Sequence, residues 1–207
     1  MKTNPLDIRD AAPGDLDALI ALYEGAFLPS ERKPSAVIRA MASNGAYRVR
    51  IARVDGAFAG FAILFRFPGG GLALLEYMAV EPGHRARGVG QALFHDATGA
   101  VAADETLIVE VEADTQPCPE QAERIRRKGF YRRLGCLEVE GLGYRVPLPG
   151  DPPPMNLLVR RPARGALDRA TLSDWLARLY RDGYHTPADD PRLVAMLAAL
   201  PEHTRLV

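Results

Sequence analysis

The stretch from Leu74 to Leu93 constrains the fold of this chain most, and it reads LLEYMAVEPGHRARGVGQAL. A strand-like apolar run, residues 74–80, is followed by Pro82, a basic turn at 85–90 and helix-forming residues at 91–103. The first N–H groups of a helix have no intrahelical partners, and the helix dipole adds positive potential there. Glycines let the backbone approach an anion, and arginines add charge suited to phosphate oxygens. The stretch therefore predicts a phosphate-binding turn between a strand and a helix.

The charge balance narrows the class of partner. The 207 residues include 26 Lys or Arg and 26 Asp or Glu, so the formal net charge is zero. A nucleic-acid or membrane-surface binder normally shows a basic excess, so we expect neither partner. No apolar stretch is long enough to span a membrane, and residues 1–15 lack the apolar core of a signal peptide. We therefore expect a cytoplasmic protein.

The cysteines and histidines do not indicate a metal site. Cys118 and Cys136 lack the spacing of metal ligands, and the four histidines are scattered along the chain. Structural disulfides are rare in a reducing compartment, so we expect two unpaired thiols and no bound metal.

Hydrophobic periodicity predicts alternating helices and strands over residues 1–162. The expected helices cover residues 15–27, 35–41, 91–103 and 120–134. The expected strands cover residues 7–10, 46–54, 58–67, 72–80, 105–113, 136–146 and 155–159. Short connections favour an antiparallel meander, and a crossover helix favours a parallel pair. We therefore predict an α/β (α+β) fold with a mixed, mostly antiparallel, central sheet flanked by helices.

The remaining residues, 163–207, change in character. Helical periodicity predicts helices at residues 170–182 and 192–200, and Asp190-Pro191 suits a helix start. So short a segment seldom buries enough apolar area to fold alone. We predict a C-terminal helical extension packed on a domain that spans residues 1–162.

Two familiar phosphate-binding motifs do not fit the basic turn. A P-loop needs Lys followed by Ser or Thr after its second glycine, whereas Gln91 and Ala92 follow Gly90. A dinucleotide-binding fingerprint needs a further glycine at position 93, which is Leu.

A third motif fits the spacing. The pattern V-x-P-x-x-R-x-x-G-x-G at residues 80–90 resembles the pyrophosphate-binding motif of the GNAT superfamily, the acetyl-CoA-dependent N-acetyltransferases. Residues 130–136, FYRRLGC, resemble the second motif of that family, in which a helix tyrosine precedes Leu-Gly and a strand. The predicted element order also matches that fold over residues 5–160, and the C-terminal extension lies outside the resemblance.

The resemblance implies how the chain would bind acetyl-CoA and use it. The backbone of Met78, Ala79 and Val80 would pair with the pantetheine arm as a neighbouring strand does. Amides of the turn would hold the pyrophosphate, and these belong to Arg85, Ala86, Arg87, Gly88, Val89, Gly90 and Gln91. Tyr131 would protonate the departing thiolate, since a phenol has a pKa of about 10 and a thiol about 8.5. A strand N–H near Met78 would stabilise the carbonyl oxygen during direct attack by an amine.

The resemblance also implies an amine acceptor, which must lose a proton to a base. Glu76 is the candidate base, because a carboxylate in an apolar strand is costly to bury; the alternative is a paired or rim-exposed glutamate. Glu110 is a candidate acceptor contact, although its alternation with Glu112 is also typical of a solvated face. Phe27 and Glu31 are further candidates beside a proline-bounded loop, where the glutamate is otherwise a solvated charge.

The sequence departs from the second motif at one position. Many family members carry an Asn near the start of the helix that bears the tyrosine, and residues 118–124 contain none. Gln121 and Arg124 are the candidate replacements for its contact with the cofactor. The C-terminal helices are candidates to cover the sheet, shape the acceptor pocket or mediate a homodimer.

These features predict an N-acetyltransferase that moves acetyl from acetyl-CoA to a primary amine of a small molecule or peptide. Nothing in the sequence selects the acceptor. The alternative is a non-catalytic acyl-CoA sensor or interaction module of the same fold, and the presence of Tyr131 argues against it.

Overall fold

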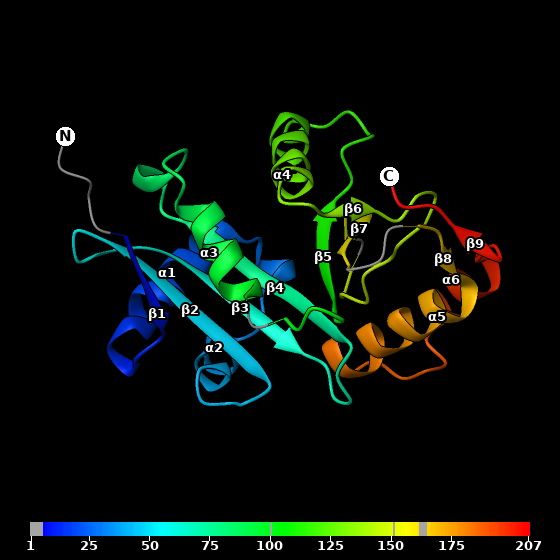
Figure 1. Ribbon diagram of the computed structural model, residues 1–207, viewed down its shortest axis with the longest axis horizontal. Coiled ribbons are helices and arrows are strands. Elements are labelled where there is room, and N and C mark those ends of the chain that lie inside the picture. The colour runs from blue at the N-terminus through cyan, green and yellow to red at the C-terminus, as the bar shows by residue number, and fades with distance from the viewer. Residues whose placement is uncertain (1–5, 100, 151, 162–164) are drawn as a thin grey trace. The chain divides into compact units, whose positions relative to one another are not determined.

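The computed structural model describes residues 6–99, 101–150, 152–161 and 165–207, which form two compact units. The first unit comprises Met1–Arg66 with Leu74–Ala102, and the second comprises Phe67–Ala73 with Ala103–Val207. Figure 1 shows their helices and strands along the chain.

The first unit holds a set of antiparallel strands with helices packed against them. Its elements are β1 (Leu6–Asp10), α1 (Leu16–Ala26), α2 (Ser35–Met41), β2 (Tyr47–Val54), β3 (Ala57–Arg66), most of β4 (Leu72–Val80) and α3 (Val89–Thr98). The strand order is β1-β2-β3-β4, and β1 and β3 both pair antiparallel with β2. Asp55 (φ 52°) and Gly56 (φ 79°) make the tight turn of the β2–β3 hairpin, where right-handed strand twist favours positive φ.

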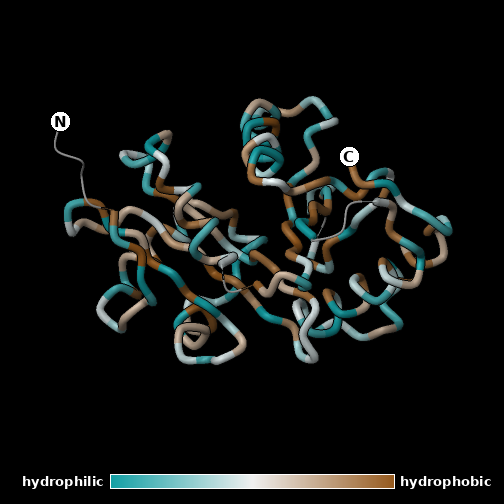
Figure 2. The backbone as a smooth tube through the Cα atoms, viewed as in Figure 1, coloured by the Kyte–Doolittle hydropathy of each residue, from teal (hydrophilic) through white to brown (hydrophobic). Residues whose placement is uncertain are grey.

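Buried side chains from both helices and strands form the core of the first unit. Its members are Leu19, Ile20, Leu22, Tyr23, Ile38, Met41, Val49, Ile51, Phe61, Ile63, Tyr77 and Ala79. The periodic residues of α1 supply part of this core, as expected from their three- and four-residue spacing. Helix α4 (Gln121–Arg133) of the second unit is, by contrast, largely hydrophilic (Figure 2).

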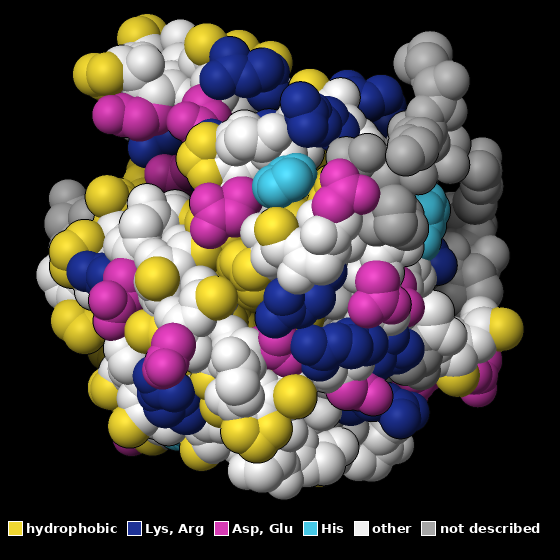
Figure 3. Space-filling model, turned by 90° about the vertical axis from the view of Figure 1, so that its left-hand side faces the viewer, with side chains coloured by type: hydrophobic (Ala, Val, Ile, Leu, Met, Phe, Trp, Pro, Cys, Tyr) yellow, Lys and Arg dark blue, Asp and Glu magenta, His cyan; other side chains and the backbone are white. Residues whose placement is uncertain are grey.

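Charged side chains on the first unit are joined in ion pairs. Arg50 on β2 contacts Asp10 and Asp96, and Arg9 and Arg53 both bind the buried carboxylate of Asp15. Figure 3 shows basic and acidic side chains intermingled over the visible face. A surface of this kind presents no broad field of one sign.

The second unit combines a short antiparallel set of strands with the C-terminal helices. Its elements are β5 (Thr106–Glu112), α4, β6 (Leu137–Glu138), β7 (Met155–Arg160), β8 (Leu167–Asp168), α5 (Arg169–Arg178), a π-helical turn (Leu179–Gly183), α6 (Pro191–Ala199) and β9 (His203–Thr204). The strand order is β5-β7-β6, with antiparallel pairing throughout, and β8 pairs with β9. Val207 exchanges backbone hydrogen bonds with Glu138, so the last residues extend the edge at β6.

The C-terminal helices predicted from periodicity are confirmed, with a different start for the first. Asp168 caps α5 by accepting a hydrogen bond from the backbone N–H of Thr171 at 2.7 Å. The helices belong to the same compact unit as β5 and α4, and the domain boundary at residue 162 stays a prediction. Among the described residues, no helix is both long and apolar enough to cross a membrane.

Two elements are shorter in the structure than the sequence predicts. The strand expected at 136–146 is reduced to β6, because Gly141 adopts φ 70°, a conformation outside the β region. The helix expected at 91–103 runs from Val89 to Thr98, where the Thr98 hydroxyl donates to the carbonyl of Phe94 and Gly99 follows. Glycine disfavours continuation of a helix, so the element ends there.

Candidate functional site

The basic turn of the first unit has the backbone expected of an anion-binding loop. Ala86 (φ 58°) and Gly88 (φ 83°) are both left-handed, and α3 begins at Val89 directly after them. Residues 85–88 are exposed, and the Arg85 side chain donates to the carbonyl of Val80 at 3.1 Å. Turns with such alternating backbone present N–H groups on one side, next to the positive end of the helix dipole.

Strand β4, which leads into this turn, has two different faces. Tyr77 and Ala79 are buried in the core of the first unit, whereas Glu76, Met78 and Val80 are only partly buried. The strand is held closely on its β3 side: a Cβ on Gly60 would lie 2.6 Å from the carbonyl oxygen of Ala79. The position of the predicted pantetheine strand is therefore fixed by backbone packing.

Glu76 lies beside a cation from the segment before α2. Its carboxylate forms an ion pair with Nζ of Lys33, and the two side chains are 9% and 24% exposed. A neighbouring ammonium stabilises an ionised carboxylate and so weakens it as a proton acceptor. The structure thus gives Glu76 the partner that the alternative interpretation anticipates, and its role as a base stays a prediction.

An aromatic cluster places Phe27 and Glu31 near the same strand. The Tyr77 ring meets those of Tyr23 and Phe27 edge-on, with centroids 4.9 and 5.1 Å away. The Tyr77 hydroxyl donates to the backbone carbonyl of Glu31 at 3.2 Å, and the backbone N–H of Lys33 donates to the Tyr23 hydroxyl at 2.7 Å. Burial raises the pKa of both phenols, which therefore remain hydrogen-bond donors. Phe27 and the backbone of Glu31 thus contact Tyr77 on β4, while the Glu31 carboxylate accepts a hydrogen bond from the N–H of Leu28 at 3.3 Å.

Helix α4 of the second unit carries Tyr131 on its buried side. Tyr131 is 7% exposed, and burial raises its pKa, although the positive charge of Arg127 opposes the rise. The phenol is therefore protonated at all physiological pH values, as a proton donor must be.

The basic residues of α4 are largely engaged in ion pairs with acids of the same unit. Arg124 and Arg127 both contact Glu112, and Lys128 contacts Asp114 and Glu138. Arg124 and Gln121, the candidate replacements for the missing Asn, also donate to the backbone carbonyls of Ala113 and Asp114. Both side chains thus fix the start of α4 against the segment after β5.

Glu110 on β5 is bound by two tyrosines that the sequence did not single out. The hydroxyl of Tyr144 donates to Oε1, and the hydroxyl of Tyr184 donates to Oε2 at 2.6 Å. These tyrosines are 34 and 74 residues away along the chain and belong to no recognised motif. A long-range contact of this kind leaves no local signal in the sequence.

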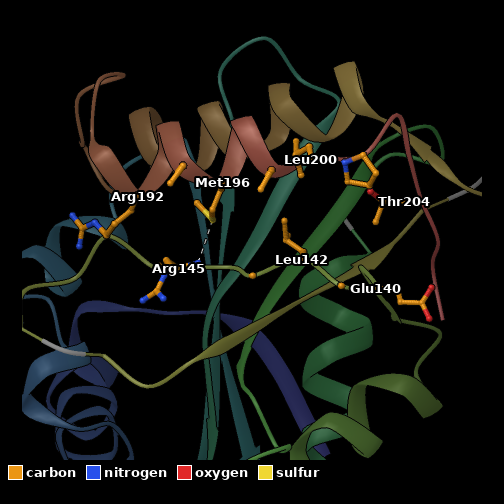
Figure 4. Close-up of a pocket in the computed structure, with 12 residues that line it drawn as sticks. Glu140, Leu142, Arg145, Arg192, Met196, Leu200 and Thr204 are labelled. Carbon is orange, nitrogen blue, oxygen red and sulfur yellow. Dashed lines mark hydrogen bonds between the residues drawn. The ribbon is translucent and has the colours of Figure 1, made fainter.

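A pocket of about 280 Å³ lies within the second unit. The segment Glu140–Arg145 forms one side and α6 the other, with Leu142 on the first side facing Met196 and Leu200 on the second (Figure 4). Its volume lies just below the usual range for small-molecule sites.

The described residues contain no candidate metal site. No group of three or more His, Cys, Asp or Glu side chains suited to a metal ion occurs within residues 6–99, 101–150, 152–161 and 165–207. Cys118 and Cys136 are free thiols, and burial raises the pKa of Cys136 to about 12. A buried thiol of this kind is unreactive at neutral pH.

The predicted site residues are divided between the two units. The first unit holds Phe27, Glu31, Glu76, residues 78–80 and residues 85–91, and the second holds Glu110 and Tyr131.

Comparison with known proteins connects these features to a family. Residues 45–135 match the sequence profile of the family described as the acetyltransferase (GNAT) domain, which confirms the resemblance found from the two motifs. The matched range includes the 80–90 turn and Tyr131, but neither Tyr144 nor Tyr184. No curated protein matches the sequence.

Solved structures show the same fold, as predicted from the element order. A protein from Bacteroides thetaiotaomicron assigned to the GNAT family is 22% identical, with a TM-score of 0.68 over 87% of this chain and 99% of that one. The ribosomal-protein-S18-alanine N-acetyltransferase of Escherichia coli is 18% identical, with a TM-score of 0.57 over 78% and 96%. NAA60 of Arabidopsis thaliana, solved in complex with acetyl-CoA, is 19% identical, with a TM-score of 0.58 over 76% and 98%.

Proposed function

We propose that the chain transfers acetyl from acetyl-CoA to a primary amine, because residues 45–135 match the family described as the acetyltransferase (GNAT) domain. The observation that carries the proposal is the exposed turn at residues 85–88, with left-handed Ala86 and Gly88 before the first residue of α3. This arrangement suits a pyrophosphate, because unpaired N–H groups and the helix dipole both favour an anion there.

The residues of the first unit fit the donor molecule. The amides from Ala86 to Gln91 would hold the pyrophosphate, whereas the N–H of Arg85 already donates to the carbonyl of Pro82. The partly buried residues Met78 and Val80 belong to the strand that would pair with the pantetheine arm. Acetyl-CoA supplies an activated acetyl carbonyl when it is bound. The backbone N–H near Met78 would donate to the carbonyl oxygen as negative charge develops on it.

Two side chains would move the protons of the reaction. As the C–N bond forms and the C–S bond breaks, Tyr131 gives its phenolic proton to the leaving sulfur. Glu76, directly or through a water molecule, takes a proton from the attacking nitrogen. Burial raises the pKa of Tyr131, so the phenol carries its proton at neutral pH.

Thermal unfolding with and without acetyl-CoA tests the donor half of the proposal. A specific ligand at 100 times its Kd stabilises the fold by about 2.7 kcal/mol, so a clear rise in Tm is expected. Arg87→Gln should reduce the rise, because Arg87 lies exposed in the turn, while Arg39→Gln on α2 should not. No rise for the wild type at millimolar acetyl-CoA refutes the proposal.

A panel of primary amines tests the acceptor half. Acetyl-CoA-dependent release of free thiol should increase with at least one amine and follow saturation kinetics. A protein whose Tm rises with acetyl-CoA, but which releases thiol at the same rate with every amine and with none, is a sensor rather than an enzyme.

A further inference from the structure

The turn that joins β3 to β4 has an inherently flexible sequence. Gly69, Gly70 and Gly71 follow one another there, and all three are left-handed, with φ of 82°, 73° and 73°. Glycine loses more conformational freedom on folding than any other residue, so a run of three is costly to hold in one conformation. The N–H of Gly70 donates to the carbonyl of Phe67 at 3.2 Å, and the N–H of Thr106 donates to the carbonyl of Gly71 at 3.0 Å. These bonds leave the carbonyl of Gly70 for another donor.

Arg178, the last residue of α5, supplies that donor from the C-terminal segment. One nitrogen of its guanidinium donates to the carbonyls of Gly70 at 2.6 Å and Pro68 at 3.1 Å. The guanidinium carbon lies 5.5 Å from the centroid of the Phe67 ring, whose face attracts a cation. Phe67 is 3% exposed and the Arg178 side chain 14% exposed, so these contacts are largely shielded from water. All four residues belong to the second unit.

Helix α5 is itself firmly held within the second unit. Leu172 and Leu176 are fully buried, and the cap at Asp168 fixes the first turn of the helix. Arg169 donates to the carbonyl of Leu197 on α6 at 2.9 Å, so the two C-terminal helices are joined. Arg178 therefore binds the glycine turn from a rigid support.

The turn held by Arg178 is the starting point of the strand that would bind the donor. Strand β4 begins at Leu72, directly after the turn, and its first two residues belong to the second unit whereas the rest belong to the first. Residues 78–80 of this same strand would pair with the pantetheine arm. Successive residues of a strand point to opposite faces, so a shift at its start changes which groups it presents further along.

We propose that Arg178 is a positioning residue for acetyl-CoA: it holds the turn at residues 67–71, fixes the start of β4 and so prepares this strand to pair with the pantetheine arm. The proposal rests on the acetyl transfer proposed above and adds to it a residue from outside the matched range 45–135. A strand already held in its binding conformation loses less freedom when the ligand binds, so affinity is higher. The C-terminal segment thus contributes to donor binding through the turn.

Equilibrium titration of the full chain with acetyl-CoA tests the proposal without an acceptor. Arg178→Met keeps an unbranched stem but removes the charge and both hydrogen bonds, so Kd for acetyl-CoA should rise roughly threefold to tenfold, the net effect of about one hydrogen bond. Arg161→Met is the matched control, because the Arg161 guanidinium lies 5.9 Å from the ring centroid of Trp175, on the same helix, rather than over Phe67. Its Kd should equal that of the wild type.

Steady-state kinetics with the best amine of the panel separate positioning from stability. In Arg178→Met, KM for acetyl-CoA should rise by the same factor as Kd, while kcat at saturating acetyl-CoA stays at the wild-type value. A residue that serves stability alone would lower Tm and leave both Kd and KM unchanged below the unfolding transition.

Gly70→Ala disturbs the same turn without altering Arg178. A Cβ at this position would meet no atom closer than 3.8 Å, so the cost arises from its φ of 73°, and Kd for acetyl-CoA should rise here too. Gly150→Ala is its control, because Gly150 has a similar φ of 79° in open space outside the turn, and this variant should bind as the wild type does.

Three results would overturn the proposal. A wild-type Kd in Arg178→Met refutes the positioning role and leaves the proposed function standing. If Arg178→Met does not fold, a wild-type Kd in Gly70→Ala refutes the role in the same way. Absence of acetyl-CoA binding by the wild type overturns the proposed function, and the positioning role with it.

Discussion

The carboxylate of Glu76 on β4 is paired with the ammonium of Lys33, which lies between α1 and α2 in the first unit. Both side chains are mostly buried, and the backbone of Lys33 is itself bound by the Tyr23 hydroxyl. The pair therefore ties the proposed catalytic strand to the segment that carries Phe27 and Glu31. Its strength can be measured without knowledge of the acceptor.

We predict that Lys33→Met lowers the free energy of unfolding by about 1–2 kcal/mol, because it leaves a mostly buried carboxylate without this cation. Urea unfolding at neutral pH gives the value. Adding Glu76→Gln to Lys33→Met should restore part of the loss, since the double variant has no charge to bury. Arg39→Met is the control, because its partner Asp17 is 90% exposed. An equal effect of Lys33→Met and Arg39→Met contradicts the prediction.

Protonation of Asp15 should make the free energy of unfolding depend on pH. Burial alone would raise its pKa, but hydrogen bonds from Arg9, Arg53 and the backbone of Ala12 outweigh burial and lower the pKa to about 2. A carboxyl group with a lowered pKa stabilises the fold above its unfolded-state pKa and loses that contribution as the pH falls through the folded value. The stabilisation amounts to about 2 kcal/mol at neutral pH.

Asp15→Asn should therefore be less stable than the wild type by about 2 kcal/mol at pH 7, and the difference should shrink between about pH 4 and pH 2. Urea unfolding at a series of pH values measures both. Asp17→Asn, at an exposed carboxylate two residues away, should show little difference at any pH. A constant difference between Asp15→Asn and the wild type across this range rules the explanation out.

Local patterns account for the parts of the fold that the sequence predicts well. The apolar spacing in α1 and the alternation in β2 reflect faces that contact the core directly, so a short window contains the information. The turn at residues 85–90 is recognisable for the same reason, since its glycines and arginines act within one loop. The prediction of a strand at 136–146 is wrong beyond β6, because the positive φ of Gly141 interrupts the extended backbone that the hydrophobic pattern of its neighbours predicts.

The partners of the site residues could not be predicted, because they are distant in sequence. Lys33 and Glu76 are brought together by packing of the α1–α2 segment on β4. The sequence around either residue does not indicate the other as its partner. Tyr144 and Tyr184 lie 34 and 74 residues from Glu110 along the chain and contact its carboxylate through tertiary packing within the second unit. Sequence motifs identify the groups that would bind acetyl-CoA, whereas these long-range contacts depend on tertiary structure.

Tyr131→Phe should separate catalysis from binding. Removal of a proton donor to the leaving thiolate should lower kcat by roughly 100-fold, the lower end of the range for general acid catalysis. Acetyl-CoA should still raise Tm as it does for the wild type, because the pyrophosphate turn belongs to residues 85–91. Thiol release with a saturating amine gives kcat, and an unchanged kcat excludes Tyr131 as the proton donor.

Gly60 tests how closely β3 and β4 must approach. A Cβ at this position would lie 2.6 Å from the carbonyl oxygen of Ala79, 3.1 Å from Cα of Val80 and 3.2 Å from Leu93, so the backbone of β4 must move. We predict that Gly60→Ala lowers the free energy of unfolding by about 1–3 kcal/mol, as overpacking does. Because Ala79 and Val80 would pair with pantetheine, the variant should also show a smaller rise in Tm with acetyl-CoA.

Gly25→Ala is the matched control for this substitution. Gly25 lies in α1, and a Cβ there would meet no atom within 4 Å. Alanine favours the helix over glycine by about 0.5–1 kcal/mol, so this variant should be more stable than the wild type and respond normally to acetyl-CoA. Opposite signs for the two Gly→Ala changes, measured by urea unfolding, would show that contact with the β4 backbone, rather than loss of glycine itself, determines the effect at Gly60. If both variants are stabilised, β4 can shift freely, and its fixed position cannot be what prepares it to pair with the donor.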